Sequence, residues 1–124
     1  MTGFDSIITF GYTRNMEETH LFYNGLLKLP MVLDQGRCRI YRVSPGGFIG
    51  FCEGTRPDPE NSVMITLVTD DVDGWFGRVS SEGHTVIKAP AMNPEFKIYH
   101  CFVKDPSGYT VEIQRFEDPR WKRG

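Results

Sequence analysis

The chain has 124 residues, of which 40% are hydrophobic and 24% are charged, and its formal net charge is −2. This length suits one compact domain, and the small net charge argues against a general attraction to nucleic acid or anionic lipid. The start MTGFDSIITFGY lacks the pattern of a signal peptide, and no apolar stretch approaches a membrane span. We therefore expect a cytoplasmic protein without nucleic-acid or membrane partners.

The first part of the chain predicts a strand, a helix and about three further strands. Residues 6–16 read SIITFGYTRNM, a run that favours a strand followed by a polar helix start. Asn15 is a good N-cap, with Glu18 three residues later, and apolar residues at helical spacing continue to Leu27. Further along, CRIYRV and FIGFCE flank a PGG turn and predict two paired strands.

The second part repeats this order. Residues 62–72 read SVMITLVTDDV and align with residues 6–16 without a gap. Asp70 or Asp71 is expected to cap the following helix, and Gly83 to stop it. The segments KIYHCFV and YTVEIQRF, joined by the turn DPSG, then match the later strands of the first part.

The repeat predicts an α+β fold built from two tandem βαβββ modules within a single domain that spans residues 1–124. Module one covers about residues 4–53 and module two about residues 62–117. Residues 54–61, GTRPDPEN, read as a linker because of their prolines and polar side chains, and residues 118–124 form a C-terminal tail. One module could not easily bury its own sheet, so we expect a curved mixed sheet with the helices on its convex side.

The three cysteines show no metal-site spacing. Cys38, Cys52 and Cys101 form no CxxC pair, and an odd number of cysteines without an export signal predicts reduced thiols. We interpret them as small, partly buried apolar side chains.

Three segments carry a resemblance to a known family: LFYNGLLKLP at 21–30, TDDVDGWFGRVSSEG at 69–83 and FVKDPSGYTVEIQRF at 102–116. With the repeated βαβββ order, they make residues 4–117 resemble the vicinal oxygen chelate superfamily, also called the glyoxalase/bleomycin-resistance/dioxygenase fold. The resemblance implies a fold that carries many different functions. Its metal enzymes place His, Glu or Gln ligands on the first and last strands of each module, pointing into a hollow.

At the four corresponding positions this chain has Ile8, Met64, either Gly50 or Phe51, and Glu112. Of these only Glu112 offers a donor atom that suits a hard divalent cation. A catalytic metal normally needs about three protein ligands. We therefore expect no metal and no other cofactor, and we regard a divalent metal as the disfavoured alternative.

Strand side chains alternate between the two faces of a sheet, and this predicts what lines the hollow. The expected lining is mostly apolar and aromatic, as in small-molecule sites, although the same residues also suit ordinary core packing. It comprises Phe10, Tyr12, Met64, Thr66 and Phe102, with either Phe48 or Phe51 from the last strand of module one.

His100 has the same parity as Glu112 on the neighbouring strand, and the two are expected to be cross-strand or diagonal neighbours. They form either a satisfied structural pair or the polar contact of a ligand. In the second case Glu112 fixes the tautomer of His100, and the other ring nitrogen acts on a substrate oxygen.

The leading functional hypothesis is a glyoxalase/bleomycin-resistance-like protein that binds a small, partly apolar or aromatic molecule in its concave sheet without a metal. The resemblance also implies a homodimer. The alternative is an enzyme of the same superfamily, of the lyase, isomerase or dioxygenase type, that uses His100 and Glu112 with or without a divalent metal.

Overall fold

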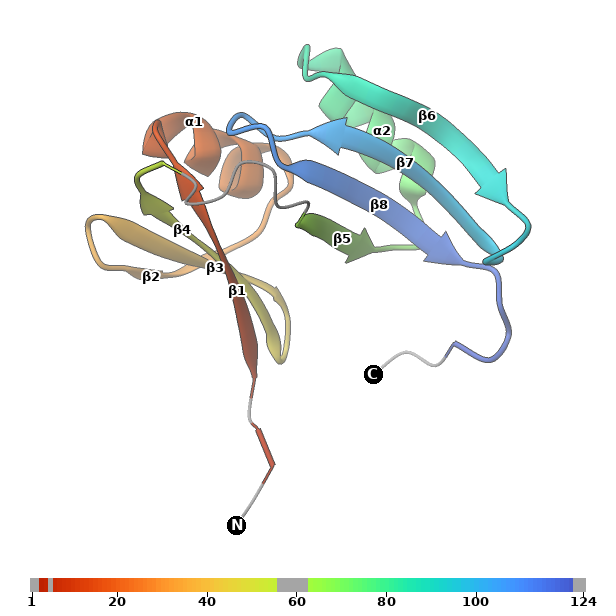
Figure 1. Ribbon diagram of the computed structural model, residues 1–124, viewed down its shortest axis with the longest axis horizontal. Coiled ribbons are helices and arrows are strands. Elements are labelled where there is room, and N and C mark those ends of the chain that lie inside the picture. Colours follow the sequence, from red (N-terminus) through yellow and green to blue (C-terminus); the bar gives the residue numbers. More distant parts are fainter. Residues whose placement is uncertain (1–2, 5, 56–62, 122–124) are drawn as a thin grey trace. The chain divides into compact units, whose positions relative to one another are not determined.

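A computed structural model describes residues 3–4, 6–55 and 63–121 (Figure 1). The chain divides into two compact units, residues 1–62 and 63–124. Each unit contains a four-stranded mixed sheet and a helical segment, which confirms the α+β fold of two βαβββ modules. Most of the predicted linker, and the last three residues of the predicted tail, lie outside the described residues.

The first unit follows the predicted order of strand, helix and three strands. Its elements are β1 (Ile7–Thr13), α1 (Met16–His20), η1 (Leu21–Leu26), β2 (Met31–Asp34), β3 (Cys38–Ser44) and β4 (Gly47–Glu53). The sheet order is β1-β4-β3-β2, in which β1 runs parallel to β4 and the other pairs are antiparallel.

Local signals explain the helical segment of this unit. The side chain of Asn15 accepts a hydrogen bond from the Glu18 backbone N–H at 3.1 Å, which confirms the predicted cap. The segment then continues as a π-helix, in which the Leu27 N–H donates to the Phe22 carbonyl at 2.9 Å. Tyr23 lies on this segment and is fully buried.

An aromatic cluster joins the helical segment to its sheet. Tyr23 stacks on Phe51 of β4, with 4.5 Å between ring centroids. The Nδ1 atom of His20 lies 2.8 Å from the hydroxyl oxygen of Tyr41 on β3, so His20 is a packing residue. The buried rings of Tyr23, Tyr41 and Phe51 define the helix-covered face of the first sheet.

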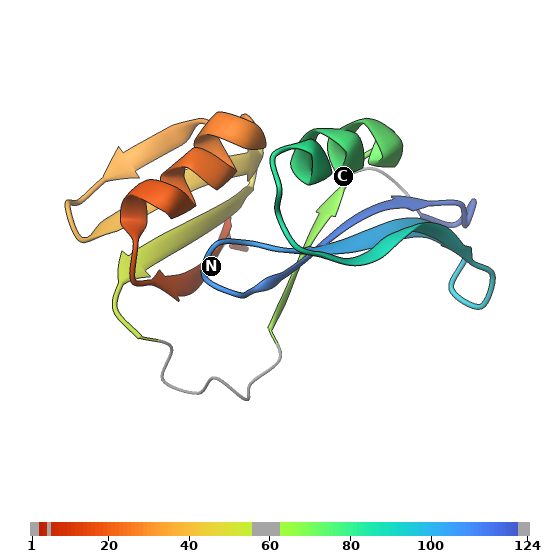
Figure 2. The same ribbon diagram turned by 90° about the horizontal axis from the view of Figure 1, so that it is seen from above.

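The second unit repeats the topology. Its elements are β5 (Met64–Val68), α2 (Val72–Ser81), β6 (Val86–Asn93), β7 (Ile98–Lys104) and β8 (Thr110–Phe116). The sheet order β5-β8-β7-β6 matches that of the first unit, and β5 again runs parallel to the last strand. Figure 2 shows that each helical segment lies on one face of its own sheet.

The second helix begins and ends where the sequence indicates. The Asp71 carboxylate accepts a hydrogen bond from the Gly74 N–H at 3.0 Å. After Ser81 the chain reaches Gly83, whose φ of 83° lies in the left-handed region that glycine adopts readily. Val72 and Val79 on this helix are fully buried, so α2 covers one face of the second sheet.

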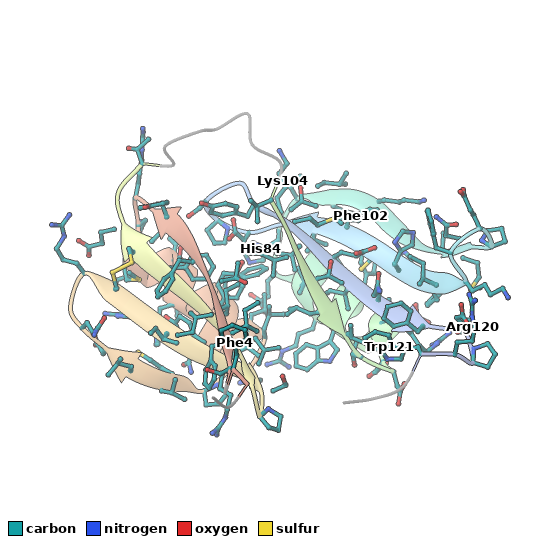
Figure 3. All side chains as sticks on the ribbon, turned by 60° about the horizontal axis from the view of Figure 1, so that its bottom comes forward. Phe4, His84, Phe102, Lys104, Arg120 and Trp121 are labelled. Carbon is teal, nitrogen blue, oxygen red and sulfur yellow. A yellow bond between two sulfur atoms is a disulfide. The ribbon has the colours of Figure 1, made fainter. Side chains whose placement is uncertain are left out.

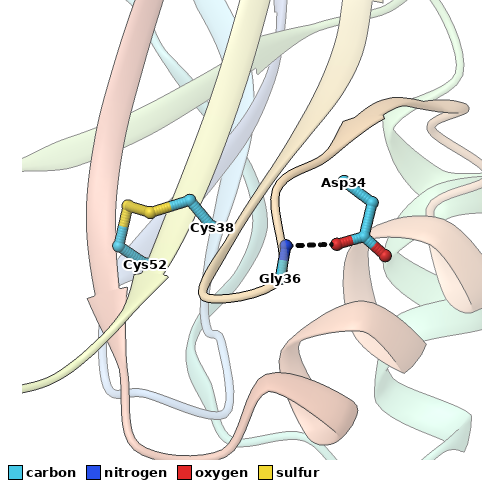
Figure 4. The surroundings of a disulfide bond; sticks show 4 residues. All are labelled: Asp34, Gly36, Cys38 and Cys52. Atoms are coloured by element: carbon cyan, nitrogen blue, oxygen red, sulfur yellow. Dashed lines mark hydrogen bonds between the residues drawn. A yellow bond between two sulfur atoms is a disulfide. The ribbon is translucent and has the colours of Figure 1, made fainter.

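The expectation of three reduced thiols is wrong for two of them. Cys38 and Cys52 are directly opposed in the β3–β4 ladder and form a disulfide (Figure 4). They are 14 residues apart in the sequence, a spacing that matches no known motif. The register of the β3–β4 hairpin brings them together. Cys101 is a free, buried thiol, as expected. Among the described residues, no helix has the length and apolar character needed to cross a membrane.

Candidate functional site: a buried carboxylate cluster on the second sheet

The two faces of the second sheet are chemically distinct. On the face covered by α2, the Tyr99 hydroxyl donates to the Asp73 carboxylate at 2.6 Å, and the Arg115 guanidinium lies 4.9 Å from the Tyr99 ring centroid. Since strand side chains alternate, His100 and Glu112 lie on the opposite face. We call this second face the open face of the second unit.

Glu112 lies at the centre of the open face and its carboxylate receives hydrogen bonds from three side chains. The Thr66 hydroxyl donates to Oε1 at 2.9 Å, and Nδ1 of His100 lies 2.6 Å from Oε2. With its amide nitrogen facing the carboxylate, Gln114 donates to Oε1 at 3.1 Å and to Oε2 at 3.0 Å. Three donors thus compensate a carboxylate that is only 5% exposed.

This arrangement follows from the strand register. Thr66 on β5 is directly opposite Glu112, and Phe102 on β7 is opposite it on the other side. His100 is opposite Gln114 and therefore reaches Glu112 diagonally. The sequence predicted this pair as neighbours, but it did not predict Gln114 as a member, although Gln114 has the same parity as Glu112.

His100 uses only one of its two ring nitrogens. The Glu112 carboxylate accepts the hydrogen bond of Nδ1–H, so in the neutral form of the imidazole the lone pair lies on Nε2. Nε2 is buried and has no hydrogen-bond partner among the described residues. Phe102 packs edge-on against the same ring, with 4.9 Å between centroids, and is itself partly exposed.

The structure places the other predicted ligand contacts on two different sheets. Met64 lies on β5 opposite Thr110, one row from Glu112, and is half exposed. Three of them belong to the first unit, where their parity puts them on the face opposite the helix: Phe10, Tyr12 and Phe48. Thr66, Phe102, His100 and Glu112 are brought together by the second sheet.

The register also settles which residue of module one corresponds to Glu112. Phe10 pairs with Gly50 in the first sheet as Thr66 pairs with Glu112 in the second. Gly50 is therefore the counterpart of Glu112, whereas Phe51 faces the helix.

These residues do not fit a divalent-metal centre. The side chains of Ile8, Gly50 and Met64 have no oxygen or nitrogen donor, and both oxygens of Glu112 already accept hydrogen bonds. Within the described ranges there is no group of three or more His, Cys, Asp or Glu residues that could hold a metal. A metal bound at Glu112 would have to break the hydrogen bonds from Thr66, His100 and Gln114. It would obtain only one protein ligand in return, the carboxylate of Glu112.

The C-terminal tail contributes a feature that sequence reasoning left open. Trp121 stacks on Phe116 at the end of β8, with ring centroids 4.0 Å apart and an interplanar angle of 17°. Phe116 has the parity of Glu112 and Gln114, so the stacked pair lies on the open face. Figure 3 labels Trp121 at the end of the described chain.

Residues 9–113 match the Glyoxalase/Bleomycin resistance protein/Dioxygenase superfamily, and the chain belongs to this family. No curated protein sequence matches it.

Solved structures of similar fold include a lactoylglutathione lyase from Agrobacterium tumefaciens, with 19% identity, a TM-score of 0.74 and coverage of 94% of this chain and 96% of that one. TioX from Micromonospora sp. ML1 has 15% identity, a TM-score of 0.76 and coverage of 89% and 97%. The fosfomycin resistance protein FosX from Mesorhizobium loti has 16% identity, a TM-score of 0.71 and coverage of 93% and 92%. At these identities the likeness concerns the fold.

Proposed function

We propose that the protein binds a small, partly apolar or aromatic molecule on the open face of the second unit, without a metal. The observation that carries this proposal is the buried Nε2 of His100, which has no partner among the described residues. A buried polar atom left unpaired costs about 1–3 kcal/mol, and a ligand hydroxyl or N–H that reaches it recovers this energy. Apolar side chains beside one placed polar group are the usual composition of a ligand site.

Access to Nε2 requires a side-chain movement. Phe102 packs against the His100 ring and is only partly buried, so a rotation of its side chain is the simplest way to admit a ligand. Thr66 and Gln114 hold Glu112 from other directions. The carboxylate and the imidazole therefore keep their positions while the ring of Phe102 moves.

A thermal-shift screen of aromatic metabolites and antibiotics tests the proposal, because a ligand that binds only the folded protein raises Tm. For any compound that raises Tm, His100→Phe keeps the ring volume but removes Nε2, and we expect the shift to disappear. Glu95→Gln, in the exposed turn after β6, is the control and should keep the shift. An unchanged shift in His100→Phe would contradict the proposed site.

The metal-free part has its own test. The purified protein is measured with and without added Ni²⁺, Mn²⁺, Fe²⁺ or Zn²⁺, for both bound metal and Tm. We expect no stoichiometric metal and no rise in Tm. One metal ion per chain with a raised Tm that Glu112→Gln abolishes would overturn this part.

The 2.6 Å contact between His100 and Glu112 favours one second candidate, an enzyme of the lyase, isomerase or dioxygenase type. A carboxylate that orients an imidazole is a common arrangement for general acid/base catalysis. Turnover of a bound compound that is lost in Glu112→Gln, with its binding retained, would favour the enzyme over the binding protein.

A homodimer and a cytoplasmic location complete the proposal. Sedimentation equilibrium at several protein concentrations tests the dimer. Disulfides are rare in a reducing compartment, so a cytoplasmic protein would keep Cys38 and Cys52 as thiols until cell lysis, although their positions allow the bond. Alkylation of thiols at the moment of cell lysis tests the location, because three blocked cysteines are expected if the protein is reduced in the cytoplasm.

A further inference from the structure

Residues 117–121, the described part of the chain after β8, are held next to the open face by hydrogen bonds and by the Trp121–Phe116 stack. The Asp118 carboxylate accepts hydrogen bonds from the Arg120 backbone N–H at 2.9 Å and from Arg120 Nη2 at 2.7 Å. The Trp121 N–H donates to the Asp118 carbonyl at 3.1 Å, which closes the turn. Just before it, the Glu117 N–H donates to the Lys97 carbonyl at 2.7 Å and extends the β7–β8 pairing. This turn presents the Trp121 ring to Phe116.

The register relates Phe116 directly to the polar cluster. His100 is opposite Gln114, so Glu112 and Phe116 are its two diagonal neighbours on β8. Diagonal neighbours in an antiparallel pair lie roughly 7–8 Å apart, within reach of aromatic side chains. Glu112 lies on one diagonal and is bonded to Nδ1 of His100, and Phe116, on which Trp121 stacks, lies on the other diagonal.

The chemistry of the two neighbours defines a ligand class. Nε2 of His100 carries a lone pair while Glu112 holds Nδ1–H, so it accepts a hydrogen bond from an acidic hydroxyl. Trp121 is 48% exposed although it is stacked on one side, which leaves ring surface for contact with a second aromatic ring. A phenol-type molecule supplies both the hydroxyl and the ring within one short, planar unit.

We propose that Trp121, stacked on Phe116, is a specificity-determining residue of the His100 site, and that the site takes a hydroxylated aromatic molecule whose hydroxyl group donates to Nε2 of His100. This inference rests on the proposed function. It adds the ligand class and a residue from the tail that the sequence left without a role.

Three probes of similar size separate the two contacts. 2-Naphthol has both the aromatic ring and the hydroxyl donor, 2-methoxynaphthalene lacks the donor, and decahydro-2-naphthol lacks the aromatic ring. Binding is followed by calorimetry and by quenching of Trp121 fluorescence in a Trp75→Phe background, which leaves one tryptophan in the chain.

The expected result is that Trp121→Ala weakens 2-naphthol binding about 3–10-fold, the range for one aromatic pair, and leaves decahydro-2-naphthol unchanged. Trp121→Phe should restore most of the affinity. His100→Phe should weaken the binding of 2-naphthol and leave the binding of 2-methoxynaphthalene unchanged. Phe96→Ala, at an exposed aromatic residue in the β6–β7 turn, is the matched control and should have no effect.

The failures are distinguishable. If His100→Phe weakens the binding of 2-naphthol and Trp121→Ala does not, the role of Trp121 is overturned and the proposed function stands. If neither variant changes the affinity, both are overturned. If the wild type does not bind 2-naphthol, the ligand class is overturned, and the wider screen still decides the proposed function. Far-ultraviolet circular dichroism of each variant excludes unfolding as the cause.

Discussion

The ring of Phe10 covers Gly50 on the first sheet. A Cβ built on Gly50 would lie 2.5 Å from Cε1 of Phe10, closer than any real contact of this kind. The two residues are also directly paired between β1 and β4, at the positions that Thr66 and Glu112 hold in the second sheet. In the first module the ring of Phe10 covers Gly50. At the equivalent positions of the second module, the hydroxyl of Thr66 is hydrogen-bonded to the carboxylate of Glu112.

Gly50→Ala is expected to lower the free energy of unfolding by about 1–2 kcal/mol, because the new methyl group forces the Phe10 ring to move. Phe10 is half exposed, so its ring can turn away and the cost stays at the lower end. Urea denaturation measures the change. In a Phe10→Ala background the penalty should be absent, and an equal penalty there would contradict the contact.

The element order could be predicted from the sequence because its signals are local. Asn15 caps α1 and Asp71 caps α2 by accepting a hydrogen bond from an N–H three residues later. Gly83 follows the end of α2 and adopts the positive φ that this position requires. Parity along the strands also placed His100 and Glu112 on one face, since a strand has a fixed period of two.

The remaining features depend on pairing between distant segments. The disulfide joins Cys38 to Cys52 only because the β3–β4 register sets them opposite each other. The one-residue choice between Gly50 and Phe51 could not be made from an alignment of the two halves, because the register alone decides it. Trp121 reaches Phe116 through a turn after β8. The alternation of residues along a strand gives no information about such a turn.

Thr66→Val tests the donor to Glu112. The substitution keeps the shape of the side chain and removes the hydroxyl that donates to Oε1. We expect a loss of about 1–2 kcal/mol in the free energy of unfolding, because a buried carboxylate loses one donor. Thr110→Val is the matched control on the same face, since its hydroxyl makes no hydrogen bond to the cluster, and should cost less. Equal costs in the two variants would argue that the hydroxyl of Thr66 contributes nothing to the cluster.

The disulfide predicts a thiol count. In denaturant without reductant, we expect one reactive thiol per chain, that of Cys101, and three after reduction. The double variant Cys38→Ser, Cys52→Ser should lose up to about 3 kcal/mol of stability, the value for a loop of this size, because the disulfide restricts the conformations of the unfolded chain. Its Tm should not respond to dithiothreitol, whereas that of the wild type should fall. Three reactive thiols without reductant would show that the bond does not form.

Cys101 makes the stability depend on pH in the alkaline range. Burial raises the pKa of its thiol from 9.0 to about 11, so at intermediate pH the folded protein keeps a proton that the unfolded chain has lost. The contribution is therefore fully present below about pH 9 and is lost as the pH rises towards 11.

Tyrosines and lysines titrate in the same pH range. The quantity to measure is therefore the difference in the free energy of unfolding between the wild type and Cys101→Ala. From pH 8 to pH 10 the free energy of unfolding of the wild type should fall by about 1 kcal/mol relative to the variant, as measured by urea denaturation. Parallel pH profiles for the two proteins would mean that the thiol titrates at its ordinary pKa and that Cys101 is accessible to water.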